Sequence, residues 1–291
     1  MHSKIYLVVP VYNRKAYTER FLHCLRRQTF RNFDIIVVDD GSTDGTAELI
    51  AEQFCEVHLL RGNGNLWWTG AINVGICHAL LKASEQDFVL VINDDLEIDD
   101  NYLEQLFELT KYMKDTLIGS VVVDIRNPGI IENGGNVVNW WTAKFRTLNS
   151  GRKLSDFPNT HCADVSLLTG RGTLIPVQVF HDVGLYDAKH FQQCGDTDLP
   201  VRARKAGYRL VVSYGAIVKS HLLASDDLNT SERYSIRDLK SYFLGVKSNF
   251  RLKYRFFFSI NTARNPIQLI TFLLCDLIRI TWHFSLRMRL R

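Results

Sequence analysis

The chain has 291 residues, of which 46% are apolar, 23% charged and 11% aromatic. This composition excludes a disordered chain, a collagen-like fibre and a continuous coiled coil. The net charge of +4 is unevenly distributed, because residues 1–236 hold 24 Lys and Arg against 29 Asp and Glu, whereas residues 237–291 hold 11 against 2. We therefore expect an anionic partner, such as an anionic membrane surface, to meet the C-terminal segment.

The six cysteines are scattered, without a C-x-x-C pair or a Cys/His spacing typical of zinc sites. We interpret them as reduced thiols of a cytoplasmic protein. The chain passes from Met1 directly into a strand-like run at residues 5–9, which is too short for the apolar core of a signal peptide. Secretion is therefore not expected.

Short apolar, β-branched runs predict strands, and amphipathic stretches between them predict helices. In chain order, the expected elements are a strand at 5–9, a helix at 16–28, a strand at 34–38, a helix at 47–54 and strands at 88–92, 120–123 and 173–176, followed by a helix at 199–206 and a pair of strands at 208–213 and 216–219. The alternation in the first hundred residues predicts an α/β fold, with a Rossmann-like, mostly parallel sheet covered by helices on both faces.

Acidic pairs follow two of the predicted strands. Asp39 and Asp40 come after the second strand, and Asp94 and Asp95 follow the strand at 88–92. Ligands of such sheets bind outside the carboxyl ends of the strands. Adjacent carboxylates after a buried strand point to Mg²⁺ or Mn²⁺, whose remaining ligands are phosphate oxygens and water. A simple turn is the alternative for Asp39 and Asp40.

Two nucleotide-binding classes lack their motifs. The first strand is followed by P-V-Y-N at residues 10–13 instead of G-x-G-x-x-G, and the chain has no G-x-x-x-x-G-K-[ST]. The dinucleotide-binding and P-loop interpretations therefore lose their support.

Five segments together resemble family 2 glycosyltransferases, inverting enzymes of the GT-A fold, and the rhamnosyltransferase-like members that build bacterial surface polysaccharides. They are V-P-V-Y-N-R at 9–14, V-D-D-G-S-T-D-G-T at 38–46, N-V-G at 73–75, N-D-D at 93–95 and G-D-T-D-L at 195–199. The resemblance covers residues 4–222. It implies a GT-A catalytic domain at 1–230, with a nucleotide-sugar half at about 1–100 and an acceptor half at about 101–230.

The resemblance also implies roles on the donor side. Asp40, with Asp39 as the alternative, would accept a hydrogen bond from N3–H of uracil or thymine, which cytosine cannot donate. Pro10, Tyr12 and Asn13 would line the nucleoside pocket, with Tyr12 stacked on the base. Asp95 would bind Mg²⁺ or Mn²⁺, Asp94 would lie near the ribose or the metal waters, and His221 would complete the metal shell, although a lone histidine is commonly structural.

On the acceptor side, the resemblance makes Asp196 the base that deprotonates the acceptor hydroxyl, even though Gly195 replaces the usual Glu. Asp198 is the alternative base, or it caps the helix that follows. Flat aromatic rings among small residues suit a sugar, so we expect Trp67 or Trp68, together with Asn73, to line the donor-sugar or acceptor pocket. A loop anchored to the next helix is the plainer alternative. Arg171 would meet phosphate or acceptor, or be solvated.

Residues 231–291 are predicted to form a basic, amphipathic helical tail. A membrane span at 267–285 is disfavoured, because Asp276 and Arg279 lie at its middle. The pattern favours a helix lying on an anionic membrane, and the alternative is a helix docked on the catalytic domain.

The resulting hypothesis is a glycosyltransferase that moves a hexosyl or deoxyhexosyl group from a UDP- or dTDP-sugar to a growing, possibly lipid-linked, surface glycan. It would work on the inner face of the membrane and would not bind nucleic acid. A nucleotidyltransferase and a catalytically inactive protein that binds a glycan or a partner enzyme are the alternatives.

Overall fold

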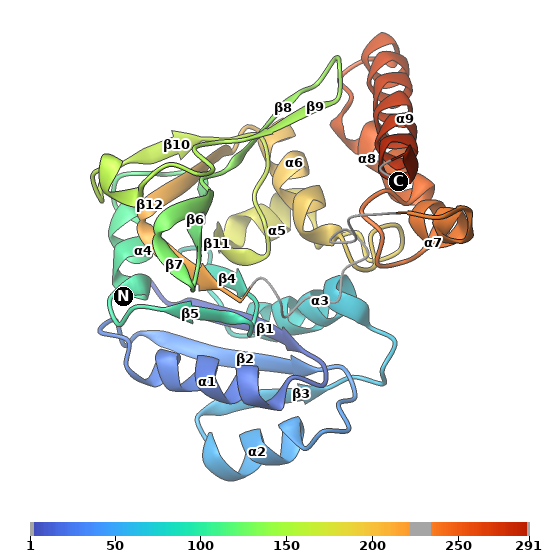
Figure 1. Ribbon diagram of the computed structural model, residues 1–291. Helices are drawn as coiled ribbons and strands as arrows, with labels where there is room; N and C mark the ends of the chain where they lie inside the picture. The colour runs from blue at the N-terminus through green and yellow to red at the C-terminus, as the bar shows by residue number, and fades with distance from the viewer. Residues whose placement is uncertain (1–2, 222–233, 290–291) are drawn as a thin grey trace.

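A mixed β-sheet of ten strands organises the computed structural model, which describes residues 3–221 and 234–289 (Figure 1). The strand order is β10-β12-β6-β11-β4-β1-β2-β3, while β5 pairs with β12 and β7 with β6. The strands are β1 Ile5–Val11, β2 Phe33–Asp39, β3 Val57–Arg61, β4 Phe88–Ile92, β5 Leu96–Ile98, β6 Thr116–Asp124, β7 Asn127–Asn133, β10 Cys162–Asp164, β11 Arg171–Pro176 and β12 Arg209–Ser220. A separate hairpin consists of β8 Asn136–Asn139 and β9 Lys144–Thr147.

The first hundred residues form the parallel part of the sheet, as predicted. Strands β3, β2, β1 and β4 are parallel neighbours. Successive residues of β1 face opposite sides, and each side is buried under helices. Helices α1 Lys15–Arg26, α2 Thr46–Gln53 and α4 Tyr102–Thr110 cover one face, whereas α3 Trp67–Leu80, α5 Val177–Val183 and α6 Asp198–Lys205 cover the other.

The second half of the sheet departs from the prediction of a mostly parallel sheet. Strand β11 is antiparallel to both β4 and β6, and β12 is parallel to β6 but antiparallel to β5 and β10. The predicted strand pair at 208–213 and 216–219 is also wrong, since β12 runs through both segments. At its irregularity, the Ser213 hydroxyl accepts bonds from the N–H groups of Gly215 and Ala216, so the strand continues instead of turning.

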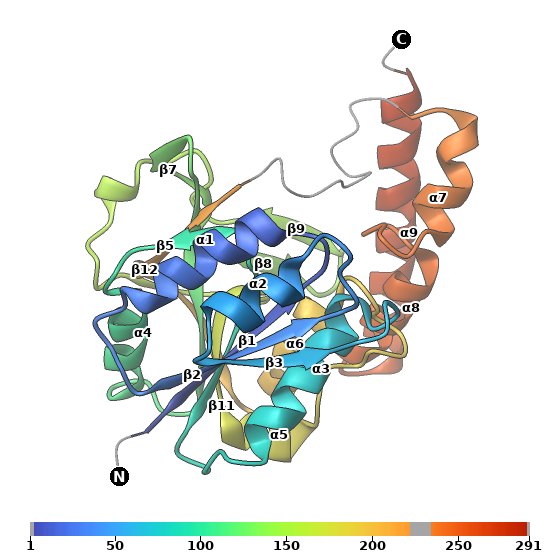
Figure 2. The same ribbon diagram turned by 90° about the horizontal axis from the view of Figure 1, so that it is seen from below.

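Three C-terminal helices follow, α7 Leu239–Leu244, α8 Leu252–Thr262 and α9 Pro266–Arg289. Helices α8 and α9 pack beside α6 and the β8–β9 hairpin, while α7 packs on α8 and α9 (Figures 1 and 2). Phe258 of α8 and Phe272 of α9 share a buried cluster with Leu167, Phe191 and Val201. The C-terminal helices are therefore docked on the rest of the protein through a common core. The predicted boundary at residue 230 lies outside the described residues.

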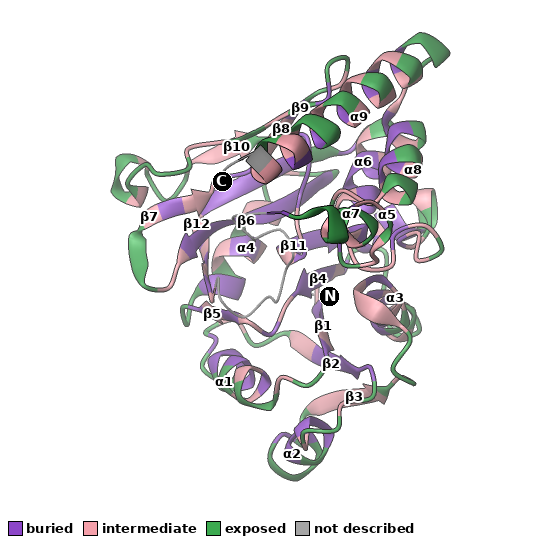
Figure 3. Cartoon of the chain, turned by 45° about the vertical axis from the view of Figure 1, so that its right-hand side comes forward, coloured by how far each residue is buried: buried purple, intermediate pink, exposed green. Residues whose placement is uncertain are grey.

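Helix α9 buries two polar side chains among apolar ones. Asp276 is fully buried and Gln268 nearly so, alongside Phe272, Ile280 and Phe284. The outward side, seen as a green stripe along α9 in Figure 3, consists largely of apolar side chains that are 44–69% exposed: Ile267, Ile270, Leu274, Ile278, Trp282 and Leu286. We call these six residues the apolar stripe. By length and composition, residues Pro266–Met288 are sufficient to cross a membrane.

Candidate active site

The loops after β1 and β2 are tied together by Asn13. Its backbone N–H donates to Ser42 Oγ at 2.8 Å, and its side-chain oxygen accepts from the Thr43 N–H at 2.8 Å. Asn13 adopts φ +50°, a left-handed conformation that asparagine tolerates better than most residues. The neighbouring Tyr12 is 55% exposed, and Pro10 is half-buried in β1. The Tyr12 ring is therefore free of core packing and accessible to a ligand at this edge.

Asp40 organises the segment that leads into α3. Its carboxylate accepts backbone N–H bonds from Gly64, Leu66 and Trp67, each at 2.9 Å. A carboxylate has about four acceptor positions, so roughly one remains for a ligand donor. Asp39 accepts the Ser42 N–H instead and is only 2% exposed to solvent. Of the two acids, Asp40 has the greater exposure, although it too is buried.

The tandem tryptophans lie in the first turn of α3, so the expectation of a loop at this position is wrong. Trp68 donates from Nε1 to Asn93 Oδ1 at 2.9 Å, and its ring meets Tyr186 edge-on at 5.9 Å between centroids. Trp67 is half-buried with φ +57°. Trp68 therefore links α3 to the residue directly before Asp94.

Asn73 is engaged in a structural clamp. Its side-chain N–H donates to the Tyr186 carbonyl at 2.7 Å, and its side-chain oxygen accepts the Tyr186 N–H at 3.1 Å. Both ends of the amide are thus used to hold the loop after α5 onto α3. The structure therefore gives Asn73 a structural role, and its predicted contact with a sugar stays a prediction.

Arg14 bridges the two carboxylates that follow β4. Its Nη1 lies 2.9 Å from Asp95 Oδ2 and 3.5 Å from Asp94 Oδ1. Asp94 is buried and also accepts the Thr18 hydroxyl at 2.8 Å. Burial raises the pKa of Asp94 to about 6, against the opposing effect of Arg14. No role was predicted for Arg14, although an arginine that follows β1 at the same sheet edge as two aspartates was an available signal.

The carboxylate pair suits a divalent cation better than His221 does. The Arg14 guanidinium contacts carboxylate oxygens of both Asp94 and Asp95, so the two carboxylates lie close together. Carboxylate oxygens are the ligands that Mg²⁺ or Mn²⁺ prefers. The His221 N–H donates to the Asp95 carbonyl at 3.2 Å, but the ring points to Glu97, at 3.3 Å, and Arg20, at 3.4 Å. Within residues 3–221 and 234–289, no three acidic, His or Cys side chains converge as a complete metal site.

Asp196 lies in the short 3-10 helix Gly195–Thr197 and accepts the Gly170 N–H at 3.3 Å. Burial raises the pKa of Asp196, and the positive charge of Arg171 partly opposes this rise. Arg171 also pairs with Glu132 at 3.2 Å. A side chain at Gly195 would collide with Thr69 of α3, so the local packing requires glycine at this position.

The Asp198 carboxylate has a structural role. Its carboxylate is fully buried, accepts two bonds from Arg202 at 2.7 and 3.0 Å and a third from Asn261 of α8 at 2.7 Å. It starts α6 without capping it through its side chain. The geometry therefore favours Asp196 over Asp198 as a group that can act on a ligand.

Gly170 joins the two halves of the site. It donates to Asp196 and packs so closely on the Trp68 ring that a side chain there would collide with the indole. Through Trp68 and Asn93, the sequence-predicted acids Asp94, Asp95 and Asp196 border one connected region at the edge of the sheet.

Helix α8 supports the segment that carries Asp196. The Thr197 hydroxyl lies 3.1 Å from the Tyr254 hydroxyl, and Arg251 donates to Gln192 at 3.2 Å. Together with the bond from Asn261 to Asp198, these contacts make the C-terminal helices part of the wall behind Asp196. The sequence did not indicate this link.

Comparisons with known proteins show the family of this chain. The sequence model of Glycosyl transferase family 2 matches residues 6–168. The chain is 26% identical over 238 residues to an N-acetylglucosaminyl-diphospho-decaprenol L-rhamnosyltransferase of Mycobacterium tuberculosis, covering 74% of this chain and 75% of that protein.

Two solved structures share the fold at low sequence identity. Staphylococcus aureus TarS 1–349 in complex with UDP-GlcNAc superposes with a TM-score of 0.63 at 16% identity, over 99% of this chain and 76% of that one. The Pyrobaculum calidifontis mannosyltransferase PcManGT in complex with GDP-Man and Mn²⁺ gives 0.59 at 14% identity, over 98% and 73%.

Proposed function

Since the chain belongs to glycosyl transferase family 2, we propose that it transfers a sugar from a UDP- or dTDP-sugar, with inversion, to a hydroxyl of a growing, lipid-linked surface glycan. That it is a glycosyltransferase of the GT-A fold acting on a nucleotide sugar follows from the family and the shared fold. The observation that carries the finer proposal is the connection of Asp196 through Gly170 and Trp68 to Asn93, next to Asp94 and Asp95.

The nucleotide would bind over the ends of β1 and β2. Tyr12, half-exposed and free of the core, would stack on the base, and the unused acceptor position of Asp40 would take the N3–H of uracil or thymine. Asn13 would act by fixing the two loops that form the pocket. The fold alone does not fix the base, because a solved structure of the same fold holds GDP-mannose. The preference for uracil or thymine is therefore part of the proposal.

The diphosphate would lie beside Asp94 and Asp95. We propose that these two carboxylates hold Mg²⁺ or Mn²⁺, with Arg14 released toward the phosphates, and that His221 assists only if its ring turns from Glu97. When bound, the ion supplies charge neutralisation for the departing diphosphate. Mn²⁺ in PcManGT supports this choice.

Asp196 would act as the general base. It takes the proton of the acceptor hydroxyl while the acceptor oxygen bonds to the anomeric carbon and the bond from that carbon to the diphosphate oxygen breaks. Burial favours this role, since it raises the pKa of Asp196 and makes its carboxylate a stronger base than an exposed aspartate. Arg171 would orient the acceptor or the phosphate beside it, and the half-buried Trp67 and Trp68 would border the sugar.

A lipid-linked acceptor would bring the enzyme to a membrane. The name of the mycobacterial relative includes a decaprenol diphosphate, and the apolar stripe of α9 provides a surface suited to the lipid interface. We propose peripheral attachment to the cytoplasmic face through α9 and the basic residues of the C-terminal segment.

A donor-hydrolysis screen tests the chemistry. UDP-, dTDP- and GDP-sugars are compared with Mn²⁺ and with EDTA, using the full chain and the Asp95→Asn variant. We expect hydrolysis of a UDP- or dTDP-sugar that needs the metal and is lost in the variant. Turnover of GDP-sugars alone would refute the role of Asp40, and activity that persists in EDTA would refute the metal.

A further inference from the structure

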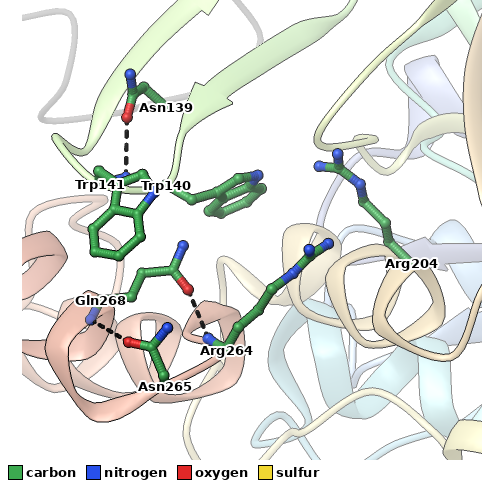
Figure 4. A pocket seen from close by; sticks show the side chains of 7 residues that line it. All are labelled: Asn139, Trp140, Trp141, Arg204, Arg264, Asn265 and Gln268. Carbon is green, nitrogen blue, oxygen red and sulfur yellow. Dashed lines mark hydrogen bonds between the residues drawn. The ribbon is translucent and has the colours of Figure 1, made fainter.

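A pocket of about 460 Å³ lies between the β8–β9 hairpin, α6 and the start of α9 (Figure 4). Trp140 and Trp141 come from the hairpin, Arg204 from the C-terminal end of α6, and Arg264, Asn265 and Gln268 from the turn into α9. Asp196 precedes α6, so the six steps from Asp198 to Arg204 separate the pocket from the active site by about 9 Å of helix. The pocket belongs to a different place on the molecule.

Two arginines of this pocket have no acidic partner. Among the described residues, no carboxylate pairs with Arg204 or Arg264, and the buried Nη1 of Arg204 has no hydrogen-bond acceptor. Arg204 lies over the Trp140 ring at 5.9 Å. Burial and the positive charge of Arg264 lower the pKa of Arg204. A buried donor without an acceptor is unfavourable for folding, so a ligand is the natural source of its acceptor.

Hydrogen-bond donors are available in the pocket, because two of its side-chain amide groups use only their oxygens. The Gln268 side-chain oxygen already accepts the Arg264 N–H at 2.7 Å, and the Asn265 side-chain oxygen accepts the Gln268 N–H at 2.8 Å, as the dashed lines in Figure 4 show. The side-chain amide groups of both residues are left for other partners. The pocket also lies at the N-terminal end of the 24-residue helix α9, where the helix dipole favours negative charge.

From these contacts we infer that the pocket binds the phosphate group of an amphiphilic ligand, a lipid phosphate at the membrane surface. A phosphate dianion matches two converging guanidinium groups in charge and in hydrogen-bond geometry. The volume exceeds that of inorganic phosphate alone and falls within the range of sites for larger molecules. Trp140 and Trp141 provide apolar walls for the rest of a headgroup.

The apolar stripe favours a lipid as the molecule that carries the phosphate group. Ile267 and Ile270, on the same helix as Gln268, are 69% and 58% exposed. A phosphate held by Arg204 and Arg264 would lie at the N-terminal end of the helix whose opposite, outward side carries the stripe, so that this helix end and the stripe would meet one lipid surface. The phosphate site goes beyond the proposed sugar transfer, and it adds a specific headgroup contact to the proposed membrane attachment.

Binding of two soluble probes to the full chain tests the inference. Isothermal titration uses inorganic phosphate and dihexanoyl phosphatidic acid below its micelle concentration. The variant is Arg204→Gln/Arg264→Gln, and the matched control Lys240→Gln/Lys247→Gln removes the same charge from exposed positions of the C-terminal segment. We expect phosphatidic acid to bind more tightly than phosphate, and the arginine variant to weaken both about tenfold or more, with the control within about twofold.

Thermal unfolding without ligand provides an independent readout. Because Arg204 and Arg264 repel each other and lack acidic partners, their replacement should leave the melting temperature unchanged or raised. A marked fall would assign the arginines to structure and overturn the inference. Equal weakening by the arginine variant and the lysine control, or no binding of either probe, would also overturn it.

Equal affinity for the two probes would support the phosphate site but refute its assignment to a lipid. Donor hydrolysis is measured in parallel and should be unchanged in the arginine variant. Failure of the proposed sugar transfer would leave the phosphate result intact, so the two proposals fail separately.

Discussion

At the carboxyl edge of the sheet, Asp94 and Asp95 come together beside Arg14, and Asp196 lies in the same connected region. On α9 the arrangement is reversed, because Asp276 is buried against the protein and the apolar stripe faces outward. At the first place, largely buried carboxylates line the region that is proposed to hold the ligand. At the second, charge is used to dock a helix, which leaves an apolar surface for another partner.

The contrast with α1 makes the inversion of α9 clear. Helix α1 buries Phe21, Leu22 and Leu25 and turns charged residues outward, as water-facing helices usually do. On α9 the buried Asp276 contacts Arg279 at 2.6 Å and Arg255 of α8 at 3.6 Å. An amphipathic pattern therefore predicts that a helix has two faces, but it does not tell which face meets the protein.

The largest expected effect concerns the acidic edge. Asp196→Asn should lower the turnover number by about 10²–10⁴, because a general base contributes on this scale. Asp156→Asn, at an exposed position away from the site, serves as the control. The readouts are transfer to a soluble acceptor and vesicle binding, and the latter should not change. A loss of less than tenfold would show that another group takes the proton.

The next effect concerns the inward side of α9. Asp276→Ala should reduce the free energy of unfolding by about 3–5 kcal/mol, since it leaves Arg255 buried without its carboxylate. The matched change on the outward side, Leu274→Ser, should stay within about 0.5 kcal/mol. Urea denaturation measures both. Equal values would mean that the two sides of α9 are not different in packing.

A smaller effect is expected for membrane attachment. Leu274→Glu/Ile278→Glu should weaken binding to anionic vesicles by about tenfold or more, because two apolar side chains no longer enter the interface. The control Leu81→Glu/Tyr112→Glu changes two exposed apolar residues elsewhere, which are 82% and 83% exposed. Vesicle co-sedimentation should separate the two variants, and equal losses would refute a specific role for α9.

The smallest effect is a shift in pH dependence. Activity should fall as the pH drops through the pKa of Asp196, and at a higher pH than an ordinary aspartate would give, since burial raises this pKa. Arg171→Gln removes a positive charge that lowers it, so the acid limb of the kcat/KM profile should move to higher pH. Arg209→Gln, which loses an exposed pair with Asp164, should leave the limb in place. A shift to lower pH would refute the assignment.

Predictions from local pattern held where the chain is locally organised. The strands at 5–9, 34–38 and 88–92 match β1, β2 and β4, because buried parallel strands are continuous apolar runs. The pairing in the second half of the sheet could not be predicted in this way, since β11 and β12 pair with strands that lie far away in the sequence. The segment at 64–71 looked like a loop from its small residues, yet Asp40 holds it and α3 begins at Trp67.

Site residues show the same division. Asp94 and Asp95 could be placed at the sheet edge, because the end of a strand fixes where the next residues lie. Arg14 between them, the clamp of Asn73 on Tyr186 and the commitment of Asp198 to Arg202 depend on contacts between distant segments. A side chain's residue type does not reveal whether its hydrogen bonds are already used.

The sequence by itself determined the α/β class, the parallel first half of the sheet and the acids at its edge, because burial periodicity and strand ends are local properties of the chain. It also determined that residues 237–291 are basic and that α9 has a polar and an apolar side. Only the tertiary structure decided that the side with Asp276 faces inward, because Asp276 needs partners that the fold brings to it. The docking of α9 also brings Arg204, Arg264 and two tryptophans together in a pocket at the N-terminal end of this helix.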